Sequence, residues 1–319
     1  MKINRLLSLL SIAILTSCSS GKNYLDGKVF CFNTIVQSVL YEGNNNNITD
    51  IKNILLEYDA LTDNYAKRDG INNVYTINSS EEAVEVDSKL YNILSKCMEV
   101  SQKYELFNPL CGSLAKKWKS ALTNKQILDE ATINEELEKI KNSTLVLGEN
   151  NTVQIIGEAE LDLGAVAKGY ANDIIHDYLA TSSITKYLIN SGVSSVLAGE
   201  KNNADGLYNV GLPLVVKREY FKAKNIFIST SGNYEQGVEI EGKTYSHIVN
   251  PITGSALNTN DAVVVLSDSG YLGDIYSTLL MMYDIDDIKT FEQEENVKTI
   301  VIRGTEIVYH HPDIEVLTH

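Results

Sequence analysis

The order in which helical and strand-like patterns follow one another constrains the fold most. Apolar residues recur at helical spacing over 48–61, 90–98 and 163–178, whereas the chain from Lys186 onward is mostly strand-like, with one helix expected from Asp274 to Tyr283. Because helices and strands do not alternate strictly, a doubly wound parallel sheet is disfavoured. We expect an α+β fold, built as one two-lobed unit over residues 28–319.

The start of the chain has the features of a lipoprotein leader. Lys2 and Arg5 precede an apolar run over 6–15, and the box Leu15-Thr16-Ser17-Cys18 follows. The run is shorter than the roughly 20 residues of a membrane span, and small residues before a Cys suit a lipoprotein signal peptidase. We therefore expect a signal peptide at 1–17, lipidation of Cys18, a tether at 18–27 and a location at the extracytoplasmic face of the cell membrane. The alternative is an ordinary secretory signal with a chance Cys.

Charge and cysteine content exclude other classes. With 27 Lys and Arg against 42 Asp and Glu, the chain has a formal charge of −15 and would repel nucleic acid. Apart from Cys18, it contains Cys31, Cys97 and Cys111, an odd number without a CxxC pair. We expect neither a disulfide framework nor a zinc site.

The segment Glu160 to Ala171 is the most informative for chemistry. A strand-like end runs through Gly164 into a helix that carries Lys168. Free backbone N–H groups at a helix start, with a lysine nearby, can bind a phosphate-like anion. The alternative is that Asp162 caps the helix and Lys168 is an ordinary exposed residue. The sequence contains neither a GxxxxGK[ST] nor a GxGxxG motif.

Two later segments also gather polar groups. Ser229 to Tyr234 is rich in hydroxyls, and His247 lies in the run Tyr245 to Gly254, although a lone His in a strand is more often structural. Asp274 and Thr278 are four residues apart, so both can lie on one helix face and offer hard oxygen ligands to Mg²⁺ or Ca²⁺. The alternative for this pair is helix capping with a Thr back-bond.

Together and in this order, these segments resemble the ApbE family of FAD:protein FMN transferases. The family's Met-Gly-Thr and Phe-Asp-Pro elements correspond to Phe32-Asn33-Thr34 and Phe107-Asn108-Pro109, the latter followed by Trp118. The Asp-Leu-Gly-x-x-Ala-Lys-Gly-Tyr-Ala element is intact at 162–171, as are Thr-Ser-Gly-x-Tyr, Ser-His-Ile-x-x-Pro-x-Thr-Gly and Asp-x-x-x-Thr. A Gly-Gly pair is replaced by Gly192-Val193, and the Asp of His-x-x-Asp-Pro by Asn250.

The resemblance implies a fold and a set of roles. Mixed or antiparallel sheets flanked by helices would hold FAD in a cleft between two lobes. Mg²⁺ would be held by Asp274, Thr278 and the Ala165 carbonyl, and His247 and Asp274 would be catalytic. The remaining residues expected to contact FAD are Phe32, Asn33, Thr34, Tyr65, Leu106, Phe107, Asn108, Trp118, Asp162, Lys168 and Val249.

The resemblance also implies a reaction. A Thr or Ser hydroxyl of an extracytoplasmic acceptor protein would attack FAD, AMP would leave, and FMN would stay on the acceptor. The chain lacks the family's own acceptor signature, Asp-Gly-x-[Ser/Thr]-Gly-Ala-Thr, so the acceptor would be another protein. The alternatives are an FAD pyrophosphatase that forms FMN and AMP, and a flavin-binding lipoprotein without catalytic activity.

Overall fold

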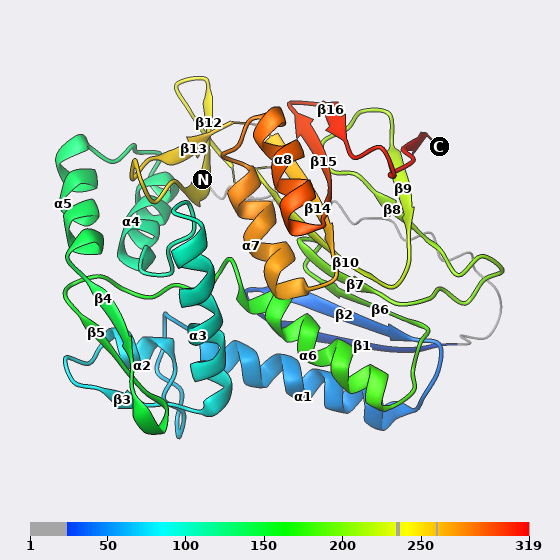
Figure 1. Cartoon of the computed structure of the whole chain (residues 1–319), viewed down its shortest axis with the longest axis horizontal. Coiled ribbons are helices and arrows are strands. Elements are labelled where there is room, and N and C mark those ends of the chain that lie inside the picture. Colours follow the sequence, from blue (N-terminus) through cyan, green and yellow to red (C-terminus); the bar gives the residue numbers. More distant parts are fainter. Residues whose placement is uncertain (1–23, 234–236, 260, 319) are drawn as a thin grey trace, which may run out of the picture.

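A computed structural model of the chain describes residues 24–233, 237–259 and 261–318 (Figure 1). The expected signal peptide at 1–17 and the lipidation site at Cys18 lie outside these residues. Strand β1 begins at Leu25, inside the expected tether, because residues 25–27 already pair with residues 38–40 of the next strand. The folded unit therefore starts three residues earlier than predicted.

One eight-stranded sheet forms the centre of the protein, and all its strand pairs are antiparallel. The interior strand β14 is almost wholly buried, and its successive residues pack alternately into two different cores. Along the sheet the strands are β1 (Leu25–Cys31), β2 (Thr34–Leu40), β6 (Tyr187–Ser191), β7 (Ser195–Ala198), β10 (Ile226–Gly232), β14 (Asp261–Ser267), β15 (Lys298–Arg303) and β16 (Glu306–His310).

Different layers cover the two faces of this sheet. Val263 and Val265 of β14 belong to the larger core, which contains the helices α1 (Asn45–Thr62), α3 (Ser88–Lys103), α6 (Ala167–Thr181), α7 (Gly270–Leu280) and α8 (Ile285–Glu295). Val264 faces the opposite core, beneath a small sheet of β8 (Tyr208–Gly211), β9 (Glu219–Ala223) and β17 (Leu317–Thr318). Because successive side chains of a strand point to opposite faces, neighbouring valines of β14 pack into opposite layers.

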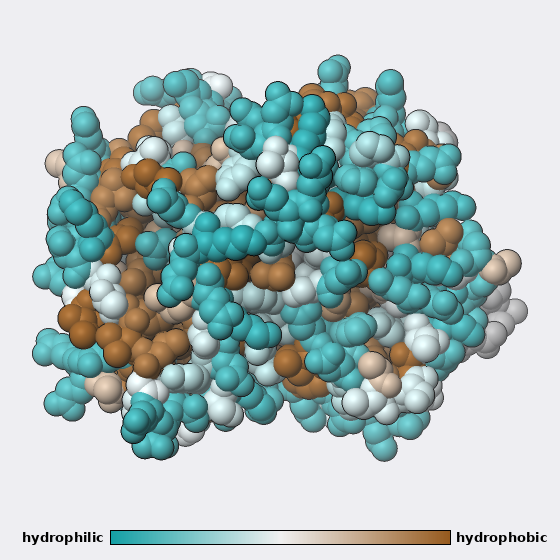
Figure 2. Space-filling view, viewed as in Figure 1, coloured by the Kyte–Doolittle hydropathy of each residue, from teal (hydrophilic) through white to brown (hydrophobic). Residues whose placement is uncertain are grey.

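A second group of elements lies beside the sheet, on the side of Figure 1 away from β15 and β16. Leu114 and Trp118 belong to a small core in one part of this group, whereas Val74, Leu145 and Val153 of the other part pack into the larger core. Hydrophilic side chains cover much of the face in Figure 2, and many of the visible apolar ones lie over this group. Its elements are α2 (Val74–Asn78), β3 (Val84–Glu85), α4 (Gly112–Thr123), α5 (Glu130–Lys141), β4 (Thr144–Leu147), the short η1 (Glu149–Asn151), β5 (Thr152–Ile156), β11 (Val238–Ile240), β12 (Lys243–Val249) and β13 (Ala256–Asn258).

The α+β prediction is confirmed, and one helix start differs from the sequence analysis. Helix α6 begins at Ala167 and not near Leu163, because the Asp162 carboxylate accepts the Gly164 N–H at 2.6 Å and holds a turn there. Helix α3 is capped by Asp87, whose carboxylate accepts the Lys89 N–H. No helix in the described segments combines the length and apolar character needed to cross a bilayer.

Helices α6 and α7 touch through two glycines. A Cβ added to Gly169 would lie 2.0 Å from the Gly270 carbonyl oxygen, and one added to Gly270 would lie 2.5 Å from the Gly169 oxygen. Both distances are far below van der Waals contact, so any side chain at this crossing would push the helices apart. The backbones therefore approach as closely as glycine permits.

We predict that Gly169→Ala lowers the free energy of unfolding by at least about 2 kcal/mol, because the new methyl group overpacks the helix crossing. Urea denaturation followed by circular dichroism measures the change. Gly211→Ala is the matched control, since a Cβ there meets nothing within 4 Å, and it should stay within about 1 kcal/mol of wild type. Equal effects of the two substitutions would contradict the close crossing.

Candidate functional site

The Asp274 carboxylate is the most buried charged group among the predicted site residues, with 6% of the residue exposed. Its Oδ1 accepts the Ser195 hydroxyl at 2.6 Å and the Ser229 hydroxyl at 2.7 Å, and its Oδ2 accepts the Gly169 N–H at 2.8 Å. Burial raises the pKa of Asp274, opposed first by the charge of Lys168 and then by these hydrogen bonds. Within the described part of the chain, Asp274 forms no ion pair.

Thr278 lies one turn further along α7, in a cluster of hydroxyls. Its Oγ1 donates to the Asp274 backbone carbonyl at 3.1 Å and lies 3.1 Å from Ser231 Oγ. Ser277 Oγ is 2.8 Å from the same Ser231 oxygen. The expected Thr back-bond is therefore present, but Asp274 does not cap α7, because Ser269 does.

The oxygen atoms at this point fit a hard divalent cation. Ser195, Ser229 and Gly169 supply three protons to a carboxylate with about four acceptor positions, which leaves one position for a cation. Among the described residues the buried negative charge also has no ion-pair partner, which a cation would provide. No group of three or more His, Cys, Asp or Glu side chains suited to a metal occurs in the described ranges, so the Thr278 hydroxyl and a backbone carbonyl would have to complete the set.

His247 lies on an irregular stretch of β12. Tyr245 pairs with Asn258 and Val249 with Ala256. An advance of four residues along β12 therefore matches an advance of two along β13, so β12 bulges around His247. Ser246 Oγ supports the bulge by accepting the Ile248 N–H at 3.0 Å. Ser246 and Ile248 point inward, whereas the His247 side chain reaches solvent.

Two other predicted site residues, Lys168 and Asp162, affect the pKa of His247. Although the side chain reaches solvent on one side, nearby protein atoms lower the pKa of His247 below its ordinary value, and the Lys168 and Lys119 ammonium groups lower it further. The Asp162 carboxylate acts in the opposite direction. The charge of Lys168 also acts on the buried Asp274 carboxylate, so the same lysine influences both groups. The imidazole is thereby kept neutral near pH 7, as a proton acceptor must be.

At the start of α6, two backbone amides that could have bound an anion already have protein partners. The Gly164 N–H is bound by Asp162, and the Gly169 N–H in the first helical turn is bound by Asp274. These amides already have protein partners, so the partly buried Lys168 ammonium is the group left to meet an anion. Asp162 in turn donates its backbone N–H to the Pro109 carbonyl at 2.9 Å, which joins the 106–108 stretch to this site.

The 106–108 stretch offers little side-chain surface. Phe107 is 7% exposed and belongs to the core, and Leu106 packs against the same core. Asn108 Oδ1 accepts the Leu110 N–H at 2.9 Å. Phe107 is therefore part of the core and supports the fold, whereas the resemblance implied that it would contact FAD.

The hairpin turn of β1 and β2 holds two residues in the left-handed region. Phe32 has φ 50° and Asn33 φ 57°, and the Phe32 N–H donates to Asp59 Oδ1 at 2.6 Å. Asn tolerates this backbone conformation, whereas Phe rarely adopts it. Thr34 then lies against Gly192, where an added Cβ would be 2.4 Å from Thr34 Oγ1. This contact connects the turn to β7, which carries Ser195.

Trp118 does not lie where the resemblance implied. It is 2% exposed, donates its indole N–H to the Gly254 carbonyl at 2.7 Å and stacks on Tyr245. Val249 packs into the same cluster. Trp118 therefore fixes the turn that follows His247, and it presents no face to a ligand.

Tyr65 lies elsewhere, on an open depression over α4. Half of it is exposed, and Lys119 Nζ lies 4.7 Å from the centre of its ring. The depression, of about 320 Å³, is lined by Tyr65, Lys116, Lys119, Ser120, Thr123 and Asn124. Lys119 links it to the electrostatic surroundings of His247.

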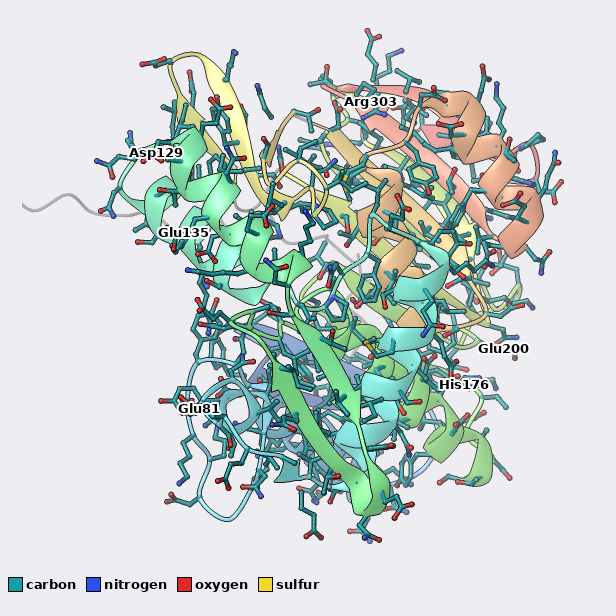
Figure 3. The ribbon with its side chains drawn as sticks, turned by 60° about the vertical axis from the view of Figure 1, so that its left-hand side comes forward. Glu81, Asp129, Glu135, His176, Glu200 and Arg303 are labelled. Carbon is teal, nitrogen blue, oxygen red and sulfur yellow. The ribbon has the colours of Figure 1, made fainter. Side chains whose placement is uncertain are left out.

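The other histidines described lie apart from this cluster. His176 is on the exposed side of α6 (Figure 3), with its ring 5.5 Å from that of Phe227. His310 ends β16 and His311 follows it, and the two contact each other and Asp313. These three histidines therefore have structural surroundings away from the candidate site.

We predict that the pKa of the His247 imidazole lies below 6.5 and rises in Lys168→Gln and, by less, in Lys119→Gln. Both substitutions remove a positive charge that disfavours the protonated ring. Titration of the imidazole resonances by NMR measures the pKa, with Lys125→Gln, on the exposed turn after α4, as the matched control. An unchanged pKa in both site variants would contradict this arrangement.

The fold and site define an α+β protein in which a lysine acts electrostatically both on a buried aspartate and on a histidine of lowered pKa. The sequence pattern of the ApbE family matches residues 32–301, and the chain belongs to that family. A FAD:protein FMN transferase of Klebsiella pneumoniae is 30% identical over 220 residues, and one of Vibrio cholerae 34% over 142 residues. The matched segments cover 65% and 42% of this chain, and they span 66% and 42% of the length of those relatives.

Solved structures of family members share the fold. The ApbE protein of Thermotoga maritima superposes with a TM-score of 0.76 at 20% identity, covering 89% of this chain and 96% of that one. The flavin transferase ApbE of Vibrio cholerae gives 0.71 at 21% identity, covering 92% and 96%. These matches confirm the predicted ApbE-like fold.

Proposed function

We propose that this chain is a Mg²⁺-dependent FAD:protein FMN transferase. The observation that carries the proposal is the buried Asp274 carboxylate, which has no ion-pair partner in the described segments and is influenced by the charge of Lys168, the lysine that also acts on His247. The sequence relatives named above as FAD:protein FMN transferases support the same activity.

The proposed reaction balances as a phosphoryl-type transfer. The hydroxyl oxygen of an acceptor Thr or Ser attacks the FMN-side phosphorus of FAD, the bond from that phosphorus to the bridging oxygen breaks, and AMP leaves. His247 accepts the hydroxyl proton, for which its lowered pKa keeps it deprotonated near neutral pH. Lys168 binds the phosphate oxygens through its charge.

Asp274, Thr278 and the Ala165 carbonyl would hold Mg²⁺. The ion would stabilise the negative charge that develops as the phosphorus to oxygen bond breaks. Ser195 and Ser229 would orient the carboxylate for this task, each through one hydrogen bond. The open depression beside Tyr65 and the hairpin turn at 32–34 are the surfaces left for FAD, since Trp118 and Phe107 are buried.

We predict that Asp274→Asn lowers the turnover of FMN transfer by a factor of roughly 10² or more, because the amide lacks the charge that binds a hard cation. His247→Ala should lower it by a similar factor through loss of the proton acceptor. AMP release and the mass of the acceptor protein are both measured, with FAD and excess Mg²⁺. Asp286→Asn, on the exposed surface of α8, is the control and should behave as wild type.

The two readouts separate the alternatives. AMP release without a mass increase of the acceptor would indicate an FAD pyrophosphatase, and FAD binding without AMP release would indicate a flavin-binding lipoprotein. Full transfer by Asp274→Asn, or by wild type in EDTA, would refute the role of the metal.

We further propose that the protein is a lipoprotein, anchored through Cys18 at the extracytoplasmic face of the cell membrane. The box Leu15-Thr16-Ser17-Cys18 after a basic and apolar leader supports this proposal. Cys18→Ala should abolish lipid attachment, so that the protein leaves the membrane fraction or keeps its leader. Cys111→Ala is the matched control, and a membrane-bound, processed Cys18→Ala protein would show that the anchor assignment is wrong.

A further inference from the structure

Helices α6 and α7 each carry a carboxylate that caps the N-terminus of the other helix. The Asp173 carboxylate of α6 accepts the N–H groups of Gly270 at 2.7 Å and Tyr271 at 2.9 Å, both in the first turn of α7, and the Ser269 hydroxyl at 3.2 Å. In return, Asp274 of α7 accepts the Gly169 N–H in the first turn of α6. Each carboxylate thereby satisfies amides that have no partner within their own helix.

The geometry makes Asp173 part of a connected unit with the proposed metal ligands. Asp274 and Thr278 lie on α7, whereas Ala165 lies just before α6. The relative position of these two helix starts therefore decides whether the three oxygens converge. Contact between Gly169 and Gly270 sets how closely the helices approach, but one contact point leaves rotation about it free.

Hydrogen bonds at both helix starts remove that freedom. Asp173 binds α7 one turn before Asp274, while Asp274 binds α6 one turn before Asp173. Burial raises the pKa of Asp173, and the α7 amides, Ser269 and the nearby Lys96 act in the opposite direction. A carboxylate at a helix N-terminus interacts favourably with the free amides there and so helps to fix the position of the helix.

We propose that Asp173, which is not among the residues proposed to bind FAD or the metal, is a positioning residue. It aligns α7 with the turn before α6, so that Asp274 and Thr278 face the Ala165 carbonyl. This inference rests on the proposed metal site. It assigns a role to a residue outside the metal ligand set.

The test measures metal binding and backbone protection, both without turnover. Asp173→Asn keeps the size of the side chain but turns an N–H donor toward the amides of α7. We expect it to weaken binding of Mn²⁺, used as a spectroscopic probe and followed by electron paramagnetic resonance, by roughly fivefold to tenfold, the size of a lost helix cap. Exchange of the Gly169 amide hydrogen should accelerate by a similar factor.

Asp177→Asn is the matched control, because Asp177 lies one turn further along α6 with a largely exposed carboxylate, and it should change neither readout. All measurements are made well below the melting temperature of each variant, and Asp173→Glu, which keeps the charge, should recover part of the affinity. Should Asp173→Asn lower only the melting temperature and keep Mn²⁺ affinity within twofold of wild type, the positioning role is wrong.

Wild type and Asp274→Asn separate this inference from the proposed function. If wild type binds Mn²⁺ and Asp274→Asn does not, the metal site stands, and the Asp173 result decides the positioning role alone. If wild type and Asp274→Asn bind Mn²⁺ equally, or neither binds it, the metal site fails and the positioning role fails with it.

Discussion

The arrangement of the site depends on how the protein keeps the Asp274 carboxylate buried. An unpaired carboxylate in a protein interior would cost several kcal/mol, so it must be compensated by hydrogen bonds or by charge. Here the compensation comes from β7 through Ser195, from β10 through Ser229 and from α6 through Gly169. The three donors come from three elements, so the carboxylate fixes α7 against the central sheet and the neighbouring helix at once.

The electrostatic surroundings of the site differ from those of the whole chain. The formal charge of −15 disfavours any approaching anion, yet Lys168 and Lys119 both act on His247. Their positive potential opposes protonation of the imidazole and also favours a ligand that carries phosphate. One local field thus serves both the histidine and the proposed substrate, while the acidic remainder of the surface would repel polyanions such as nucleic acid.

Much of the fold could be predicted from apolar periodicity. The chain from Lys186 onward is mostly strand, as expected, and β12 and β16 show the alternation of more and less exposed residues that marks a strand. Helix α8 was not predicted, because its buried Ile288 and Phe291 are surrounded by acidic and polar residues. Trp118 was placed on the FAD wall by resemblance, whereas packing against Tyr245 buries it, and a residue pattern does not reveal the side to which an aromatic ring turns.

The sequence by itself determined the candidate site residues, because Lys168, His247 and the Asp274–Thr278 pair lie in continuous motifs that can be recognised locally. Only the tertiary structure decided which groups donate hydrogen bonds to Asp274. Ser195, Ser229 and Gly169 lie 79, 45 and 105 positions from Asp274, and no local signal marks them. Hydrogen bonds across such separations depend on strand order and on the close crossing of α6 and α7, which form only when the whole sheet and its helices have packed.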